Sequence, residues 1–223
     1  MHIFSRELSI VDRIQLSLSL FLRITVVIAI ISSIFNQSWT VLFVSVLTLI
    51  LTFLPSIIEK SYDVTLPLEF ELVIVMFIYA SIYLGEVHSY YTLFWWWDLV
   101  LHTGSGLVLG AIGFALLYIL HEQRKIQTSA FLIAIFSFSF AVAMGAIWEI
   151  FEFGIDALLP ATYMQESLSD TMWDLIVDGA GAFAASFMGY LYIKKVKVHL
   201  LHRMITRFVE QNPKLFAKFN RNN

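Results

Sequence analysis

Six apolar runs of about 20 residues limit this chain more than any other feature, because a helix of that length crosses the hydrocarbon core of a bilayer. A membrane β-barrel would instead alternate polar and apolar residues in strands of about ten residues, and the sequence lacks that pattern. The expected fold is an all-α bundle of about six transmembrane helices. We predict a single transmembrane domain over residues 1–193, with spans at residues 15–35, 39–58, 68–84, 95–120, 128–158 and 172–193.

The composition supports this assignment. The chain is 59% hydrophobic and only 14% charged, whereas soluble domains carry about one quarter charged residues. Its 223 residues leave no room for a separate soluble domain beside six spans. The chain has no cysteine, which excludes disulfides, thiolate metal sites and cysteine nucleophiles. No signal-peptide cleavage pattern follows the first apolar run, so we expect that run to be retained as a span.

Lysine and arginine predict the orientation. None occurs in the connections after the first, third and fifth spans, whereas the other connections and both ends of the chain carry them. Basic residues stay on the cytoplasmic side, so we expect both termini inside. Arg23 lies within the first span, and either its side chain reaches back toward the cytoplasm or the span begins after it.

The last segment, residues 194–223, is basic. Apolar residues recur in it at helical spacing among arginines and lysines, which favours an amphipathic helix on the anionic inner leaflet. A partly disordered basic tail is the alternative. The residues that make up the pattern are Leu201, Met204, Ile205, Phe208, Lys197, Arg203 and Arg207.

Ionisable residues converge at the ends of three spans that we expect to meet near the outer surface. Each set recurs at intervals of three or four residues and therefore lies on one helix face. At ~1.5 Å per residue, all three sets fall at a similar depth, roughly 10 Å below the surface. The sets are Asp98 and His102 on the fourth span, Glu149, Glu152 and Asp156 on the fifth, and Asp174 and Asp178 on the sixth.

Each residue of this cluster also has a simpler interpretation. Asp98 could cap the fourth helix, and Asp170 or Asp174 the sixth. His102 could be an ordinary hydrogen-bonded core residue. Other acidic or histidine residues nearby are most simply loop residues in water: Glu86, His88, Asp156, Glu166 and Asp170.

Taken together, the carboxylates predict a bound cation. Carboxylates packed together repel one another unless they are protonated, paired or bound to metal, and no lysine or arginine lies on that side. Carboxylate ligands suit Mg²⁺, Ca²⁺ or Mn²⁺, and a histidine beside them also admits iron or zinc. The expected metal ligands are Asp98, His102, Glu149, Glu152, Asp174 and Asp178.

Glycines in the same spans predict close helix packing. Gly106 and Gly110 form a small-xxx-small pair, and Gly179, Gly181 and Gly189 recur along the sixth span. Small residues let helix backbones approach one another in lipid.

Four segments together resemble a known family. They are Gly85-Glu86, the run from Trp97 to His102, the run from Trp148 to Glu152, and the run from Ser169 to Asp178. In order and composition they resemble the YjdF-like family of uncharacterised bacterial inner-membrane proteins, over roughly residues 68–191. The resemblance implies a small multi-pass protein of the bacterial cytoplasmic membrane. It implies no particular reaction.

Three functions fit the sequence. The first is a metal-dependent enzyme whose metal polarises a phosphate or carbonyl of a lipid-like substrate, or activates water. The second is a cation or proton transporter, although the inner halves of the last three spans are almost purely apolar. The third is a non-catalytic partner protein in which the acidic cluster is structural. We expect the protein to contact the lipid bilayer and to have no nucleic-acid partner. The sequence is compatible with a homo-oligomer.

Overall fold

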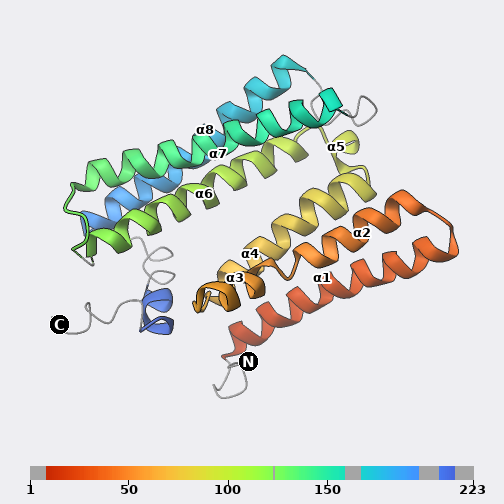
Figure 1. Ribbon diagram of the computed structural model, residues 1–223, viewed down its shortest axis with the longest axis horizontal. Coiled ribbons are helices and arrows are strands. Elements are labelled where there is room, and N and C mark those ends of the chain that lie inside the picture. The colour runs from red at the N-terminus through yellow and green to blue at the C-terminus, as the bar shows by residue number, and fades with distance from the viewer. Residues whose placement is uncertain (1–8, 123, 159–166, 196–205, 214–223) are drawn as a thin grey trace. The chain divides into compact units, whose positions relative to one another are not determined.

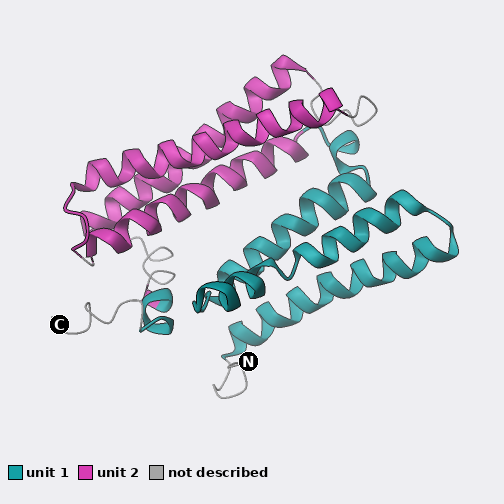
Figure 2. Cartoon of the chain, in the orientation of Figure 1, with its two compact units in different colours: residues 1–95, 207–215 teal, residues 96–206, 216–223 magenta. Residues whose placement is uncertain are grey.

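Helices make up almost all of the described chain. The computed structural model describes residues 9–122, 124–158, 167–195 and 206–213, and these residues contain no strand. Six helices among them are long and apolar enough to cross a membrane, as the sequence predicts. The chain divides into two compact units, residues 1–95 with 207–215 and residues 96–206 with 216–223 (Figures 1 and 2). The single domain predicted for residues 1–193 stays a prediction, and each unit is described by itself.

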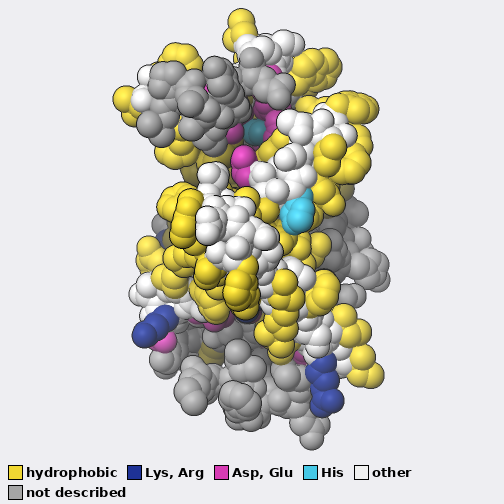
Figure 3. All heavy atoms as spheres, turned by 90° about the vertical axis from the view of Figure 1, so that its right-hand side faces the viewer, with side chains coloured by type: hydrophobic (Ala, Val, Ile, Leu, Met, Phe, Trp, Pro, Cys, Tyr) yellow, Lys and Arg dark blue, Asp and Glu magenta, His cyan; other side chains and the backbone are white. Residues whose placement is uncertain are grey.

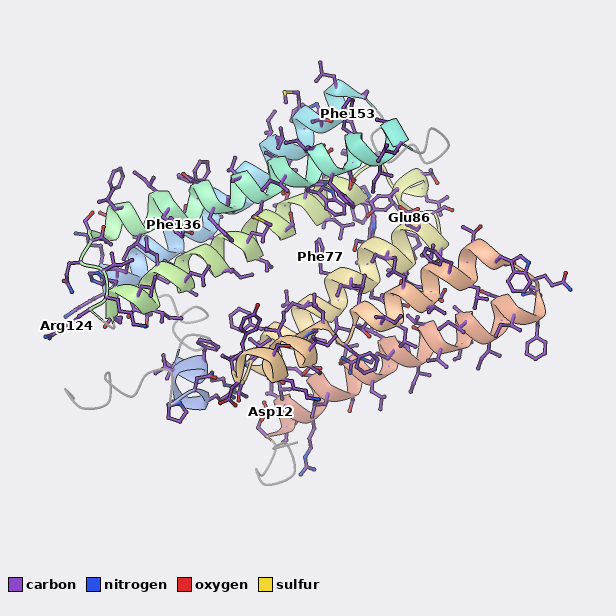
Figure 4. All side chains as sticks on the ribbon, in the orientation of Figure 1. Asp12, Phe77, Glu86, Arg124, Phe136 and Phe153 are labelled. Atoms are coloured by element: carbon purple, nitrogen blue, oxygen red, sulfur yellow. The ribbon has the colours of Figure 1, made fainter. Side chains whose placement is uncertain are left out.

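Unit 1 holds the first three spans. The first is α1 (Ile10–Phe35), the second is formed by α2 (Trp39–Leu51) and α3 (Leu54–Tyr62), and the third by α4 (Leu68–Ile78) and the π-helix η2 (Tyr79–Val87). The short α5 (Tyr90–Leu93) follows. Helix α1 packs against α2 and α4, and α2 also packs against η2. Figure 4 shows Asp12 and Glu86 at opposite ends of this unit.

The first span begins earlier than residue 15, and its cap explains why. The Ser9 side chain accepts a hydrogen bond from the Asp12 backbone N–H, and the Asp12 side chain accepts one from the Ser9 N–H. This reciprocal capping box satisfies two donors that a helix N-terminus otherwise leaves unpaired. The helix therefore starts at Ile10.

Arg23 bridges a break in the second span. Pro55 cannot continue a helix from α2, because its ring clashes with the preceding turn, and α3 starts afresh with Pro55 in its first turn. Arg23 Nη2 donates to the Thr52 carbonyl oxygen at the break (2.8 Å) and lies 3.3 Å from Glu71 Oε1. Its guanidinium also stacks over the Phe53 ring. The arginine inside the first span is thus paired within the protein.

Residues 206–211 are helical, and those from Arg207 onward belong with unit 1. Arg207 pairs with Glu69 and lies 3.7 Å from Asp12. The buried Asn212 side chain accepts from the Thr65 N–H (2.7 Å) and donates to the Thr65 carbonyl oxygen (2.8 Å). Of the residues expected to form the amphipathic tail, Arg207 and Phe208 are described, and the others lie outside the described residues.

Unit 2 is a three-helix bundle of α6 (Trp97–Glu122), α7 (Ala130–Leu158) and α8 (Leu168–Ile193), in which each helix packs on the other two. Figure 4 shows Arg124, in the α6–α7 connection, and Phe153, on α7, toward opposite ends of this unit. The Ser137 hydroxyl of α7 donates to the Gly110 carbonyl oxygen of α6 (2.6 Å). Such an interhelical bond supplies attraction that apolar contact alone does not supply in lipid.

Glycines set the close approach of α6 and α8. A Cβ on Gly106 would lie 2.2 Å from the Asp178 carbonyl oxygen, and one on Gly181 would lie 2.2 Å from the Thr103 carbonyl oxygen. The packing role predicted for Gly106, Gly110, Gly181 and Gly189 is confirmed, but Gly179 faces open space.

Candidate functional site

The bundle of unit 2 brings the predicted site residues to one end. Helix α6 starts there with Asp98 and His102, α7 ends there with Glu149 and Glu152, and α8 starts there with Asp174 and Asp178. Figure 3 shows acidic side chains gathered around a histidine in the upper part of one face of the molecule. Because α7 runs opposite to α6 and α8, its C-terminal end meets their N-terminal ends.

His102 lies at the centre of the cluster and is held by Asp178. His102 is 8% exposed, and its Nδ1 lies 3.3 Å from Asp178 Oδ2. The Ser105 hydroxyl donates to the other carboxylate oxygen, Asp178 Oδ1, at 2.8 Å. Both oxygens of Asp178 therefore have partners, and a proton on Nδ1 leaves the Nε2 lone pair of His102 available to a ligand.

The Nε2 side of His102 faces two further carboxylates. Nε2 lies 3.6 Å from Asp98 Oδ1 and 4.0 Å from Glu149 Oε1. These separations are too long for hydrogen bonds. They fall in the range of roughly 3.0–4.2 Å that separates two ligand atoms bound about 2.1 Å from one shared ion.

Two buried carboxylate oxygens at this point have no hydrogen-bond partner among the described residues. They are Asp174 Oδ1 and Glu149 Oε1, on side chains of residues that are 2% and 5% exposed. A buried carboxylate oxygen without a partner costs free energy, because nothing replaces the water that the group gave up. Thr171 hydrogen-bonds to the Glu149 carboxylate, so Glu149 is only partly satisfied.

Three residues form a group with the geometry of a metal site. One ligand atom each from Asp98, His102 and Asp174 lie within 4.8 Å of one another. The Asp98 side chain is 36% exposed, whereas His102 and Asp174 are buried. The donor set of one imidazole and carboxylates suits zinc, iron or manganese.

The remaining acidic residues lie around this group. Glu152 is half-buried one turn beyond Glu149 on α7, and it interacts electrostatically with Glu149, His102 and Asp98. Asp156 and Asp170 are half-buried and have interactions of their own. Glu86 and His88 are exposed residues of unit 1, and Glu166 lies outside the described residues.

Sequence reasoning missed three residues that shape the site. Ser105 lies one turn beyond His102 on the same helix face, and this spacing could have identified it. Gly145 lies one turn before Glu149, and a Cβ there would lie 2.4 Å from Asp178 Oδ2. No pattern in the sequence indicates Thr171, because its contact with Glu149 depends on how α7 and α8 are rotated about their axes.

Six membrane-length helices, with ionisable side chains gathered at one end of the last three, define a multi-pass membrane protein. The chain belongs to the family described as "Predicted membrane protein (DUF2238)", whose model matches residues 18–195. It is similar to a Thermotoga maritima protein described as "Uncharacterized protein", with 28% identity over 138 residues, which cover 62% of this chain and 70% of that protein. No solved structure matches the chain.

Proposed function

We propose that this protein is a metal-dependent enzyme of the bacterial cytoplasmic membrane that acts on a lipid-like substrate near the outer surface. The observation that carries the proposal is Asp174. Its side chain is almost fully buried, its Oδ1 has no hydrogen-bond partner in the described chain, and it lies in a group with Asp98 and His102. A bound divalent cation would supply the missing partner. The bacterial membrane location follows from the resemblance to the YjdF-like proteins.

We infer different roles for the six predicted ligands. Asp98, His102 and Asp174 are the core ligands, and Glu149, with an unpartnered oxygen 4.0 Å from His102 Nε2, is the fourth. Asp178 orients His102 from the far side of the ring, in the arrangement by which a carboxylate fixes a metal-binding histidine. Glu152 stands beside the ligands as a carboxylate able to accept a proton.

The chemistry of such a site is that of a Lewis acid at the edge of a membrane. A divalent ion polarises a carbonyl or phosphoryl oxygen and makes a bound water more acidic. Glu152, which interacts electrostatically with Glu149, His102 and Asp98, is the group that would take the proton of an attacking water. The half-exposed Asp98 marks the open side, where a substrate enters.

Helix packing below the site favours this proposal over transport. Gly106 of α6 meets the Asp178 backbone, and Gly110 packs against Ala182 and Ala185 of α8. Ser137 of α7 hydrogen-bonds across to α6. A proton or ion relay through unit 2 would need polar side chains between the helices below the site. Close contact between the backbones of α6 and α8 leaves no space for such side chains.

Metal analysis tests the proposal. Wild-type protein and the Asp174→Asn, Glu149→Gln double variant are purified in detergent, assayed for metal content, and melted with and without added Mn²⁺, Zn²⁺, Mg²⁺ and Ca²⁺. We expect stoichiometric metal and a raised melting temperature in wild type only, because a ligand bound to the folded state stabilises it. Wild-type protein without metal or metal response would refute the metal site. A variant that only folds less well would favour a structural role for the cluster.

A further inference from the structure

Four basic residues lie together at the end of unit 2 that is opposite to the candidate site. Arg124 and Lys125 follow α6, and Lys194 and Lys195 follow α8. All four are exposed, and Figure 4 shows Arg124 at this end of the unit. Because α6 and α8 pack side by side and run in the same direction, the two basic pairs meet at one end of the bundle.

A pair of tyrosines holds the two helix ends together. The Tyr118 side chain of α6 hydrogen-bonds to Tyr192 of α8, and the centroids of their rings lie 5.6 Å apart. Tyr118 also hydrogen-bonds to Glu122, the last residue of α6. No other acidic residue occurs in residues 99–148 or 179–209. The one carboxylate near the basic pairs is therefore bonded to a tyrosine.

The four basic residues have no ion-pair partner among the residues that the structure describes, whereas Arg23 and Arg207 of unit 1 pair with carboxylates. The potential at this end of unit 2 is therefore positive. The Lys194 ammonium lies 5.8 Å from the centroid of the Tyr190 ring, and tyrosine and lysine are both typical of the membrane–water interface. Since the helices are of membrane length, their ends lie at the level of the phospholipid phosphates.

Two of the four residues have a backbone conformation that favours glycine. Arg124 has a φ of 56° and Lys195 a φ of 62°, in the left-handed region that the residue after a helix often adopts. Glycine adopts this conformation without steric cost, whereas a side chain makes it less favourable. The helix dipole favours one positive charge at each C-terminal end, but the neighbouring Lys125 and Lys194 already supply it.

We propose that this end of unit 2 binds the headgroup of an anionic phospholipid, with the phosphate held between the pair that follows α6 and the pair that follows α8. Basic pockets between membrane helices bind anionic headgroups in this way. An arginine guanidinium binds phosphate through two parallel hydrogen bonds, and lysine adds a point charge. The basic residues predict that this end faces the cytoplasm, where the leaflet is rich in anionic lipid. Binding here does not depend on a metal at the opposite end of the unit.

Native mass spectrometry of the full-length protein in detergent tests lipid binding. Wild type and the Arg124→Gly, Lys195→Gly double variant are titrated with dioleoyl-phosphatidylglycerol, which is anionic, and with dioleoyl-phosphatidylcholine, which is zwitterionic. We expect wild type to prefer phosphatidylglycerol and the double variant to bind it about 30-fold more weakly, because each basic residue near a membrane surface contributes a factor of about five. The melting temperature should not fall, since glycine suits both positions.

Two further variants separate local binding from total charge and from folding. Lys125→Gln with Lys194→Gln leaves the left-handed positions unchanged and should weaken binding by a similar factor. Arg13→Gln with Lys60→Gln removes the same charge from exposed positions of unit 1 and should keep the wild-type preference.

Three results would overturn the proposal. The first is equal affinity of wild type for the two lipids, which would leave an acidic segment of a partner protein as the occupant of the patch. The second is an equal loss of affinity in the unit 1 and unit 2 variants, which would mean that total charge alone attracts the lipid. The third is displacement of bound phosphatidylglycerol by excess inorganic phosphate, which would mean that the patch recognises phosphate and not a lipid.

Discussion

At the residue scale, aspartates that look alike in the sequence have different surroundings. Both oxygens of Asp178 have partners, His102 and Ser105, whereas Oδ1 of Asp174 has none in the described chain. Helical spacing could predict that these side chains share one end of a bundle. It could not tell which carboxylate has hydrogen-bond partners for both oxygens, because that depends on the rotation of each helix and on side-chain rotamers.

This difference leads to a graded prediction for metal affinity. Asp174→Asn should abolish binding, whereas Asp178→Ala should weaken it about 10–100-fold, the usual effect of losing a carboxylate that orients a ligand. Ser105→Ala should have a smaller effect in the same direction, because it only loosens Asp178. Isothermal titration with Zn²⁺ or Mn²⁺ measures all three. Equal losses in Asp174→Asn and Asp178→Ala would mean that Asp178 is itself a ligand.

Gly145 permits a second prediction. A methyl group there would lie 2.4 Å from Asp178 Oδ2, so Gly145→Ala should displace that carboxylate and cost about 1–3 kcal/mol of stability. Gly154, on the same helix, faces open space, and Gly154→Ala should be neutral or slightly stabilising because alanine favours helix. Thermal melting in detergent compares the two. A harmless Gly145→Ala would show that Asp178 can move without consequence.

At the scale of helices, hydropathy predicted the spans well and their irregularities poorly. Six apolar runs correspond to six membrane-length helices, because burial in lipid depends on the average composition of a segment. The break in the second span was missed although Pro55 signals it, and the π-helix Tyr79–Val87 has no signal in hydropathy. The start at Ile10 was also missed, although Ser9 and Asp12 have the spacing of a capping box.

The broken span makes Arg23 important for stability. Arg23→Leu should destabilise the protein by about 1–3 kcal/mol, because the Thr52 carbonyl oxygen and the Glu71 carboxylate both lose a charged donor. Arg13 is exposed on the same helix, and Arg13→Gln serves as the matched control. Denaturation followed by circular dichroism measures both changes. If the two variants unfold alike, Arg23 does not support the break.

At the scale of the whole molecule, the sequence predicts orientation from the placement of basic residues. The connection at Gln37 should face outward and the connection at Gln127 should face the cytoplasm. The natural chain has no cysteine, so Gln37→Cys and Gln127→Cys each introduce a single thiol. A membrane-impermeant maleimide added to intact cells should label the first and not the second until the cells are opened. The reverse pattern would place the candidate site on the cytoplasmic side.

The pairing of Asn212 with Thr65 has a consequence for the order of biosynthesis. Thr65 precedes the third span, whereas Asn212 is translated only after all six spans have been made. Until then, the Thr65 backbone groups and the Glu69 carboxylate lack the partners that Asn212 and Arg207 provide. Unit 1 is therefore completed only after the three helices of unit 2 have been made, although its own helices are inserted first. A chain released from the ribosome before residue 207 would lack the partners of the Thr65 backbone groups and of the Glu69 carboxylate. Protein quality control can recognise such unpaired polar groups.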